Sequence, residues 1–268
     1  MKSGKLSPML VTLLLALAGT LSGLAYVLLT DETAIVNNNG MLFAVGGIVL
    51  VALIGLVMIR ETRKQLAEQA SQNERNQAAI LQLLDEIADL AEGEWLQMEN
   101  ATKKDLSYAD IQEVALKKTG SVLRWCCLIP AIISDQDPKV QQLSRRFGEH
   151  LGMAFQISDD ILDFTRGDGS QHADIKNGVI TSVIFYAYQQ RSPKRHHIDI
   201  RSISQQKLTP QEIEKGITCC RAKLGEIIGK AHSTLKEISQ NLQIADNSLS
   251  SKALTTLSSL TTYLQIRV

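Results

Sequence analysis

Three carboxylates are spaced along one short apolar stretch in a way that suits cation binding. Asp159, Asp160 and Asp163 lie within FQISDDILDF, which spans residues 155–164. On a helix, Asp163 would lie one turn from both of the other acids, so the three carboxylates can converge. Because close like charges repel, such a cluster needs a cation or a proton to neutralise it. Mg²⁺, which takes one or two carboxylates with water and phosphate oxygens, is the expected ion, and a solvated acidic face is the alternative.

The other reactive residue types do not form a second catalytic set. The four cysteines come as adjacent pairs, Cys126-Cys127 and Cys219-Cys220, without the two-residue gap of zinc ligands, and we interpret them as small buried residues. His196-His197 lies in SPKRHHIDIRS, a basic polar stretch that is typical of a loop. A cation and phosphate site works by electrostatic stabilisation, so it needs no Ser-His-Asp or Cys-His set.

Composition and periodicity favour a helical chain that does not bind nucleic acid. The sequence has 268 residues, with 28 Lys and Arg against 28 Asp and Glu, so no net charge would attract a nucleic acid. Aromatic residues make up 4%, there are 5 prolines, and the long segments repeat with helical period. We therefore expect an all-α fold and no nucleic acid among the partners.

Two uncharged stretches near the N-terminus predict a two-helix transmembrane hairpin. Residues 7–30 and 41–59 carry no charged side chain, and as helices they would be ~36 Å and ~28 Å long, close to the ~30 Å of a hydrocarbon core. Lys2 and Lys5 precede the first span and Arg60 follows the second, whereas the loop between them carries only acids. This bias predicts an inner (plasma) membrane location with both termini in the cytoplasm. The lipid bilayer is then a partner; a cleaved signal peptide is the alternative for the first stretch.

Residues 61–92 are expected to form an amphipathic helix that leaves the membrane. Ile80, Leu84 and Ile87 recur every three or four residues, which gives the segment one apolar stripe. The stripe would pack against a partner helix or against the chain's own C-terminal domain. From the second span to Glu94, the sequence resembles the membrane exit and HAMP-like segment of type IV pilus methyl-accepting chemotaxis receptors. The short loop between the spans leaves no room for the sensor domain of those receptors.

A second resemblance covers the chain from residue 93 to its end. GEWLQMEN, YADIQEVALKKTGSVLRW, GEHLGMAFQISDDILDF and ADIKNGVITS occur in an order that resembles the C-terminal half of trans-polyprenyl diphosphate synthases. This resemblance implies a partial isoprenoid-synthase helical bundle that binds an allylic prenyl diphosphate. It also implies roles for four residues: Lys118 and Thr119 would contact the diphosphate, Lys176 would support that contact, and Gln156 would lie beside the carbocation.

The same resemblance gives the three acids of the opening motif a role. Asp159 and Asp163 would hold Mg²⁺ that bridges to the allylic diphosphate, and Asp160 would support them. The reaction of the family is an ionisation, in which the metal neutralises the departing diphosphate and isopentenyl diphosphate attacks the allylic cation. The resemblance therefore predicts Mg²⁺ as the cofactor and a prenyltransferase as the enzyme class.

Two parts of the family's machinery are missing from the sequence. The family has a second aspartate-rich motif, and the acids before Glu94, Asp85-Glu86 and Asp89, do not match it. The Gly-Lys-Arg segment that grips isopentenyl diphosphate in the family is also absent. We therefore expect prenyl transfer to be incomplete in one chain, with a complementary synthase subunit or a homo-oligomer as a possible partner.

The sequence thus predicts three parts, of which the first two resemble the receptors and the third the synthases. They are a transmembrane hairpin at 1–60, a HAMP-like exit helix at 61–92 and a polyprenyl synthase-like domain at 93–268. The predicted function is that of a membrane-tethered polyprenyl diphosphate synthase-like protein. The alternatives are a membrane receptor or signalling fragment and a non-catalytic fusion product, since LAEGE at residues 90–94 fits both families.

Overall fold

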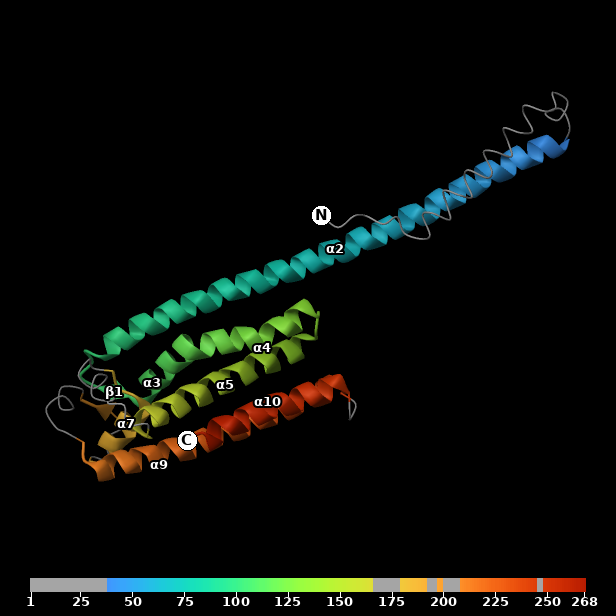
Figure 1. Ribbon diagram of the computed structural model, residues 1–268. Helices are drawn as coiled ribbons and strands as arrows, with labels where there is room; N and C mark the ends of the chain where they lie inside the picture. Colours follow the sequence, from blue (N-terminus) through green and yellow to red (C-terminus); the bar gives the residue numbers. More distant parts are fainter. Residues whose placement is uncertain (1–37, 166–178, 192–196, 200–207, 245–247) are drawn as a thin grey trace. The chain divides into compact units, whose positions relative to one another are not determined.

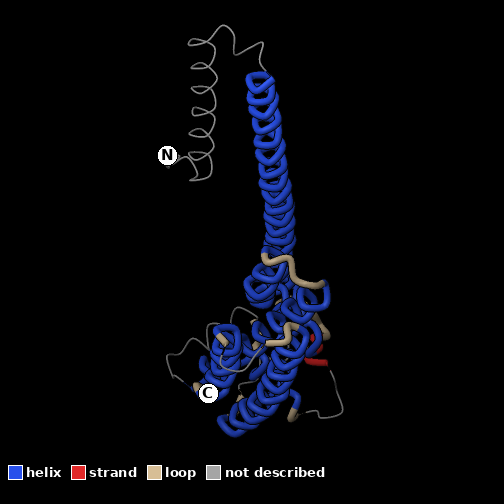
Figure 2. The backbone as a smooth tube through the Cα atoms, turned by 90° about the vertical axis from the view of Figure 1, so that its right-hand side faces the viewer, coloured by secondary structure: helices blue, strands red, loops and turns tan. Residues whose placement is uncertain are grey.

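The computed structural model describes residues 38–165, 179–191, 197–199, 208–244 and 248–268 (Figure 1). Its helices are α2 (Asn38–Asn100), α3 (Tyr108–Ala115), the π-helix η1 (Leu116–Gly120), α4 (Ser121–Ile133), α5 (Pro138–Thr165), α7 (Ser182–Gln189), α9 (Pro210–Asn241) and α10 (Leu249–Ile266). Two short strands, β1 (Leu106–Ser107) and β2 (His197–Ile198), complete the described elements (Figure 2). Contacts divide the chain into two compact units, Met1–Asn73 and Glu74–Val268.

The first unit contributes one described element, the N-terminal part of α2. Across the described residues, no helix is both long and apolar enough to cross a membrane. Of the two predicted spans, residues 7–30 lie outside the described residues. Residues 41–59 are helical, but the structure does not support them as a membrane span. The membrane hairpin therefore stays a prediction.

Helix α2 does not break where the exit helix was predicted to end. It continues through residues 92 and 93 to Asn100, and the division between the two units falls after Asn73. The stretch from 61 to 100 contains no proline and has a single glycine, Gly93, so nothing in it interrupts the hydrogen bonds of the helix. The predicted boundary between the exit helix and the synthase-like domain thus lies inside one continuous helix.

In the second unit, the end of α2 packs antiparallel to η1 and α4. Three contacts occur in reverse order along the two segments: Arg75 Nη1 to Asp135 Oδ2 at 3.2 Å, Trp125 Nε1 to the carbonyl oxygen of Ala79 at 3.4 Å, and Lys117 Nζ to Glu92 Oε2 at 2.5 Å. The backbones approach closely at Gly93, where a Cβ atom would lie 2.6 Å from the backbone nitrogen of Lys118.

The predicted apolar stripe of α2 faces away from this contact. Ile80, Leu84 and Ile87 are 59%, 56% and 53% exposed, whereas Ala79 and Glu86 are buried. The sequence left open whether this stripe packs on the chain's own C-terminal domain or against a partner helix. The first of these predictions is wrong, because the stripe is exposed. Packing against a partner helix stays a prediction.

Helix α5 forms the centre of the core, between α4 and α9 (Figure 1). Its buried apolar residues recur every three or four positions, as a helix buried along one face requires; they include Leu143, Phe147, Leu151, Ala154, Ile157 and Ile161. Side chains of α9, such as Leu224 and Ala231, complete this core and are fully buried. Each large aliphatic or aromatic side chain buried in this way contributes about 1.5–3 kcal/mol. The motif that holds the three acids is thus part of the central helix.

The strands add a short antiparallel ladder to the otherwise helical fold. Leu106 pairs with Ile198 and Ser107 with His197. Leu106 and Ile198 are both buried, and Ile198 packs with Phe185 of α7. His197 therefore lies in a strand rather than in the predicted loop, while His196 lies outside the described residues. The expected all-α fold holds for the described residues except for this ladder.

The starts of α3 and α9 follow the capping rules for helices. Ser107 caps α3 by accepting a hydrogen bond from the backbone of Asp110, whose carboxylate bonds back to the N–H of Ser107. Thr209 and Glu212 form the same box on α9, with Pro210 in the first turn. Hydrogen bonds from Arg191 and from the backbone of Thr209 lower the pKa of Glu212 to about 2. The capping carboxylate therefore stays charged at neutral pH.

Candidate functional site

Asp160, the middle acid of the motif, points into the protein, where each of its carboxylate oxygens accepts a hydrogen bond. It is buried, its Oδ1 accepts a hydrogen bond from Gln156 Nε2 at 2.9 Å, and its Oδ2 accepts one from the backbone N–H of Ser182 at 2.8 Å. Ser182 is the first residue of α7, whose positive dipole end favours a carboxylate. Burial nevertheless raises the pKa of Asp160. This residue ties α7 to α5.

Asp159 lies on a different face of α5 and is paired with the end of the chain. Its Oδ1 is 2.6 Å from Arg267 Nη2, and its side chain is 43% exposed. The same guanidinium donates through Nε to Ser158 Oγ at 2.6 Å and lies 5.0 Å from the ring centroid of Phe155. The first acid of the motif therefore has an internal cation as its partner.

The three acids consequently do not converge at one point. Asp163 is partly buried one turn after Asp159, while Asp160 is turned inward. In the described part of the chain, no group of three or more His, Cys, Asp or Glu side chains is placed to hold a metal ion. The spacing of the motif is compatible with convergence, but the partners of Asp159 and Asp160 separate their carboxylates.

Thr119 and Gln156 extend the contacts of Asp160 into a hydrogen-bond relay. Thr119 Oγ1 donates to Gln156 Oε1 at 2.7 Å, and the amide nitrogen of Gln156 donates to Asp160. The relay therefore runs from η1 through α5 to the N–H of Ser182 on α7. Since each end of the Gln156 amide has a partner of the opposite kind, the orientation of this side chain is fixed.

Lys118, a residue of η1, lies next to this relay and contacts the C-terminal end of α2. Its Nζ donates to Glu94 Oε2 and to Gln97 Oε1, both at 3.1 Å. The two lysines and the threonine of KKTG form the π-helix η1 with their neighbours, a local widening that is frequent at functional sites. The structure therefore brings together Lys118, Thr119, Gln156 and Asp160, which are four of the predicted site residues.

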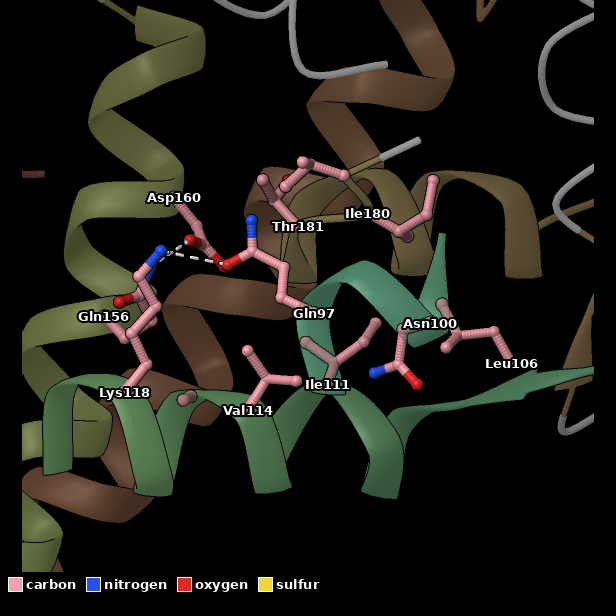
Figure 3. Close-up of a pocket in the computed structure, with 12 residues that line it drawn as sticks. Gln97, Asn100, Leu106, Ile111, Val114, Lys118, Gln156, Asp160, Ile180 and Thr181 are labelled. Atoms are coloured by element: carbon pink, nitrogen blue, oxygen red, sulfur yellow. Dashed lines mark hydrogen bonds between the residues drawn. The ribbon is translucent and has the colours of Figure 1, made fainter. Parts of the chain in front are cut away.

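These groups form the polar end of a pocket (Figure 3). Gln97, Lys118, Gln156 and Asp160 line that end, and the dashed lines in Figure 3 join these side chains. The rest of the lining is mostly apolar and comes from Leu106, Ile111, Val114, Ala115, Val179 and Ile180, with Asn100 and Thr181 as its polar members. Asp159 and Asp163 are not part of the lining, and Lys176 lies outside the described residues. Such a pocket suits a ligand with a charged head and an apolar tail.

A second group of acids, on α2, has a cation of its own. Glu86 is 3% exposed, and both of its carboxylate oxygens accept from Arg124 Nε, at 2.9 Å and 2.8 Å. The same guanidinium contacts Asp89, and it lies 3.8 Å from Glu149. Of the acids considered for a second aspartate-rich motif, Glu86 and Asp89 are therefore bound to Arg124.

Sequence reasoning missed several of these contacts. Gln97 belongs to GEWLQMEN, a stretch that carried the family resemblance, and this was the available signal for it. Arg124 and Ser182 also lie in such stretches, YADIQEVALKKTGSVLRW and ADIKNGVITS, but the partners of Arg124, Ser182 and Arg267 lie 22 to 108 positions away, so the sequence did not indicate these contacts. Asn100 is also new: it is buried in the pocket lining, and its Oδ1 has no hydrogen-bond partner in the described structure.

Comparisons with known proteins agree on one family for most of the chain. The family model described as Polyprenyl synthetase matches residues 10–220. The all trans-polyprenyl-diphosphate synthase of Mus musculus is 33% identical over 119 residues, which cover 43% of this chain and 29% of that protein. The geranylgeranyl pyrophosphate synthetase from the archaeon Geoglobus acetivorans has a similar fold, with a TM-score of 0.53 and 24% identity over 72% of this chain and 58% of that chain. The chain thus spans less than a third of the mouse relative.

A short similarity of another kind accompanies these matches. Protein PilJ of Pseudomonas aeruginosa is 63% identical over 54 residues, which cover 19% of this chain and 8% of that protein. The family match begins at residue 10, so it also includes the region for which a membrane hairpin was predicted. The polyprenyl synthetase resemblance is therefore confirmed, and the short match to Protein PilJ hints at the predicted fusion.

Proposed function

Because the chain belongs to the polyprenyl synthetase family, we propose that its pocket binds an allylic prenyl diphosphate. The observation that carries this proposal is the relay from Thr119 through Gln156 to Asp160. This fixed set of polar groups borders an otherwise apolar pocket, with the ammonium of Lys118 beside it. The donors of the relay are used within it, so the Lys118 ammonium beside it is the group suited to a diphosphate.

The two ends of the pocket would divide the substrate between them. Lys118 would hold the diphosphate, and Lys176 would add a second positive charge. Leu106, Ile111 and Val114 would lie against the prenyl chain and keep water from it. Burying that chain would supply most of the affinity, since each CH₂ group removed from water contributes about 0.8 kcal/mol.

Asp159 and Asp163 are the acids that would hold Mg²⁺, although neither of them lines the pocket, whereas Asp160 would not be a ligand. The first two lie one turn apart on α5, and the Asp159 side chain is 43% exposed. Mg²⁺ needs only one or two carboxylates when water and phosphate oxygens complete its shell. Asp160 would instead orient Gln156, because both of its oxygens already accept hydrogen bonds. When bound, Mg²⁺ would neutralise the diphosphate as the allylic bond ionises.

Prenyl transfer by one chain alone is proposed to be incomplete. Glu86 and Asp89 are bound by Arg124, so they are not available as a second metal-binding set. A complementary synthase subunit or a second copy could supply it. The exposed stripe of Ile80, Leu84 and Ile87 on α2 would be the contact surface for such a partner, because it is apolar and unpacked within the chain.

We also propose a membrane tether, with residues 1–60 in the inner membrane and both termini in the cytoplasm. The support is the charge pattern of the flanking residues. The competing function is a membrane receptor or signalling fragment, or a non-catalytic fusion product, and the similarity to Protein PilJ favours it. If the chain is a receptor fragment or a non-catalytic product, its pocket would bind no prenyl diphosphate. Measuring the binding of a prenyl diphosphate therefore separates these alternatives from the synthase-like function.

Thermal unfolding of the full detergent-solubilised chain would test the proposed function. We expect farnesyl diphosphate with MgCl₂ to raise the Tm, because a ligand at a hundred times its Kd adds about 2.7 kcal/mol to the free energy of unfolding. Asp159→Asn should remove the increase that depends on Mg²⁺. Asp85→Asn, which changes an exposed acid on α2, should keep it. An unchanged Tm of the unmodified chain would favour the receptor fragment or the non-catalytic product.

A further inference from the structure

We propose that Arg267 is a C-terminal latch, which neutralises Asp159 in the cation-free protein and releases it when Mg²⁺ binds with diphosphate. This inference rests on the proposed function, since it concerns the regulation of the same site. The inference starts from the contacts of Arg267 with α5. The guanidinium of Arg267 bonds to Asp159 and Ser158, both at 2.6 Å, and lies over the Phe155 ring. The bond between Arg267 and Asp159 is charge-assisted, which holds the two side chains in one geometry.

The latch is held in place by the fold and is not a free tail. Ser158 is fully buried, and its hydroxyl donates onward to the carbonyl oxygen of Leu264 at 3.0 Å. The carbonyl oxygen of Val268 accepts from Arg221 Nε at 2.9 Å. The last turn of α10 is thus bonded to α5 on one side and to α9 on the other. This anchoring sets the position of the guanidinium at Asp159.

Arg267 and a divalent cation would need the same carboxylate. A guanidinium so close to Asp159 repels a second positive charge. Asp160 cannot replace Asp159 as a ligand, because Gln156 and Ser182 already bond to its two oxygens. Arg267 bonds to Oδ1 of Asp159, so cation binding at this carboxylate competes with retention of Arg267. As a result, cation binding is coupled to release of the C-terminal turn.

The Asp159 side chain is accessible enough for this exchange. It is 43% exposed, while that of Arg267 is 17% exposed. An ion pair that is partly exposed contributes modestly, so a cation with diphosphate can displace it. The latch would therefore keep the acid neutral without blocking the site permanently.

The test compares Arg267→Gln with the unmodified full chain in detergent, using MgCl₂ with inorganic pyrophosphate as the probe. Two quantities are measured: the Mg²⁺ concentration at half-maximal thermal stabilisation, and hydrogen exchange of residues 258–268. The matched control is Arg145→Gln, which removes an exposed arginine of α5 that pairs with Glu149 at 3.5 Å. We expect Arg267→Gln to lower the Mg²⁺ midpoint about threefold or more, and Arg145→Gln to leave it unchanged.

Hydrogen exchange in the unmodified chain tests the same inference even if the variant fails to fold. The latch predicts that Mg²⁺ with pyrophosphate speeds the exchange of residues 258–268. Equal midpoints in the chain and in Arg267→Gln, or exchange that slows or does not change although the chain is stabilised, would overturn the latch and leave the proposed function in place. Absence of any Mg²⁺ response in all three proteins would overturn both.

Discussion

Replacing Arg124 with methionine is expected to lower the free energy of unfolding by about 3–5 kcal/mol, because Glu86 would be left as a buried charge without its cation. Glu86 is 3% exposed, and its remaining partner in the described structure is Gln82, which donates from Nε2 at 3.0 Å. An amide cannot offset a carboxylate charge, and Asp89 would keep only Lys117, which lies 3.8 Å away. Urea denaturation of the full chain, followed by circular dichroism, measures this loss.

Two controls separate loss of the ion pair from loss of packing around Arg124. In the double variant Glu86→Met with Arg124→Met, both charges are gone, so most of the stability should return. Arg145→Met on α5 removes a largely exposed arginine and should change the stability by less than about 1 kcal/mol. A change of similar size for Arg124→Met and Arg145→Met would contradict the assignment of the Glu86–Arg124 pair.

Gly148→Ala is expected to cost about 1–3 kcal/mol or more, because two helices touch at that position. A Cβ atom on Gly148 would lie 2.5 Å from the Cα atom of Arg124 and 2.7 Å from the carbonyl oxygen of Leu123. Both contacts are with the backbone of α4, which cannot move aside as a side chain can. One turn further on, Gly152→Ala should act similarly, since its Cβ would lie 2.5 Å from the Cα atom of Gly120.

Gly229→Ala on α9 is the matched control for this prediction. Nothing lies within 4 Å of the position its Cβ would occupy. Alanine should therefore stabilise the helix by about 0.5–1 kcal/mol through its higher helix propensity. Denaturant unfolding of the three variants measures all the effects on one scale. Equal and small changes at Gly148 and Gly229 would contradict the close packing of α5 against α4.

Features set by nearby residues could be predicted from the sequence. The N-terminus of α9 followed from Thr209 and Pro210, because a cap needs only the next three residues. The helical character of FQISDDILDF and its place in a buried helix followed from its periodicity. Lys118, Thr119 and Gln156 were also expected to share a site: Lys118 and Gln156 line the pocket with Asp160, and Thr119 bonds to Gln156 behind them.

Features that depend on distant partners could not be predicted in the same way. Asp159 and Asp160 are adjacent in sequence, yet one pairs with Arg267 and the other with the backbone of Ser182. Their separation results from the packing of α10 and α7 against α5, which no local pattern encodes. The strand at His197 was missed for the same reason, since a two-residue strand exists only through its partner at Ser107.

The buried face of the predicted exit helix also depends on a distant partner, although its amphipathic pattern is local. Its apolar stripe is visible in the sequence, but the face of α2 that packs on the bundle is set by Glu86 and its bond to Arg124. A buried ion pair thus outweighs the aliphatic stripe in orienting this part of the helix. Periodicity identified the helix and its faces, and it did not identify the face that is buried.

The central claim, that the pocket binds an allylic prenyl diphosphate, is tested most directly by equilibrium dialysis with labelled farnesyl diphosphate and the full chain in detergent. Saturable binding that needs Mg²⁺ is expected. Lys118→Gln should weaken it about tenfold or more, because a hydrogen bond to a charged group contributes about 1.5–3 kcal/mol. Lys104→Gln, which changes an exposed lysine outside the pocket lining, should bind as the unmodified chain does. No saturable binding, or binding unaffected by Lys118→Gln, would contradict the account.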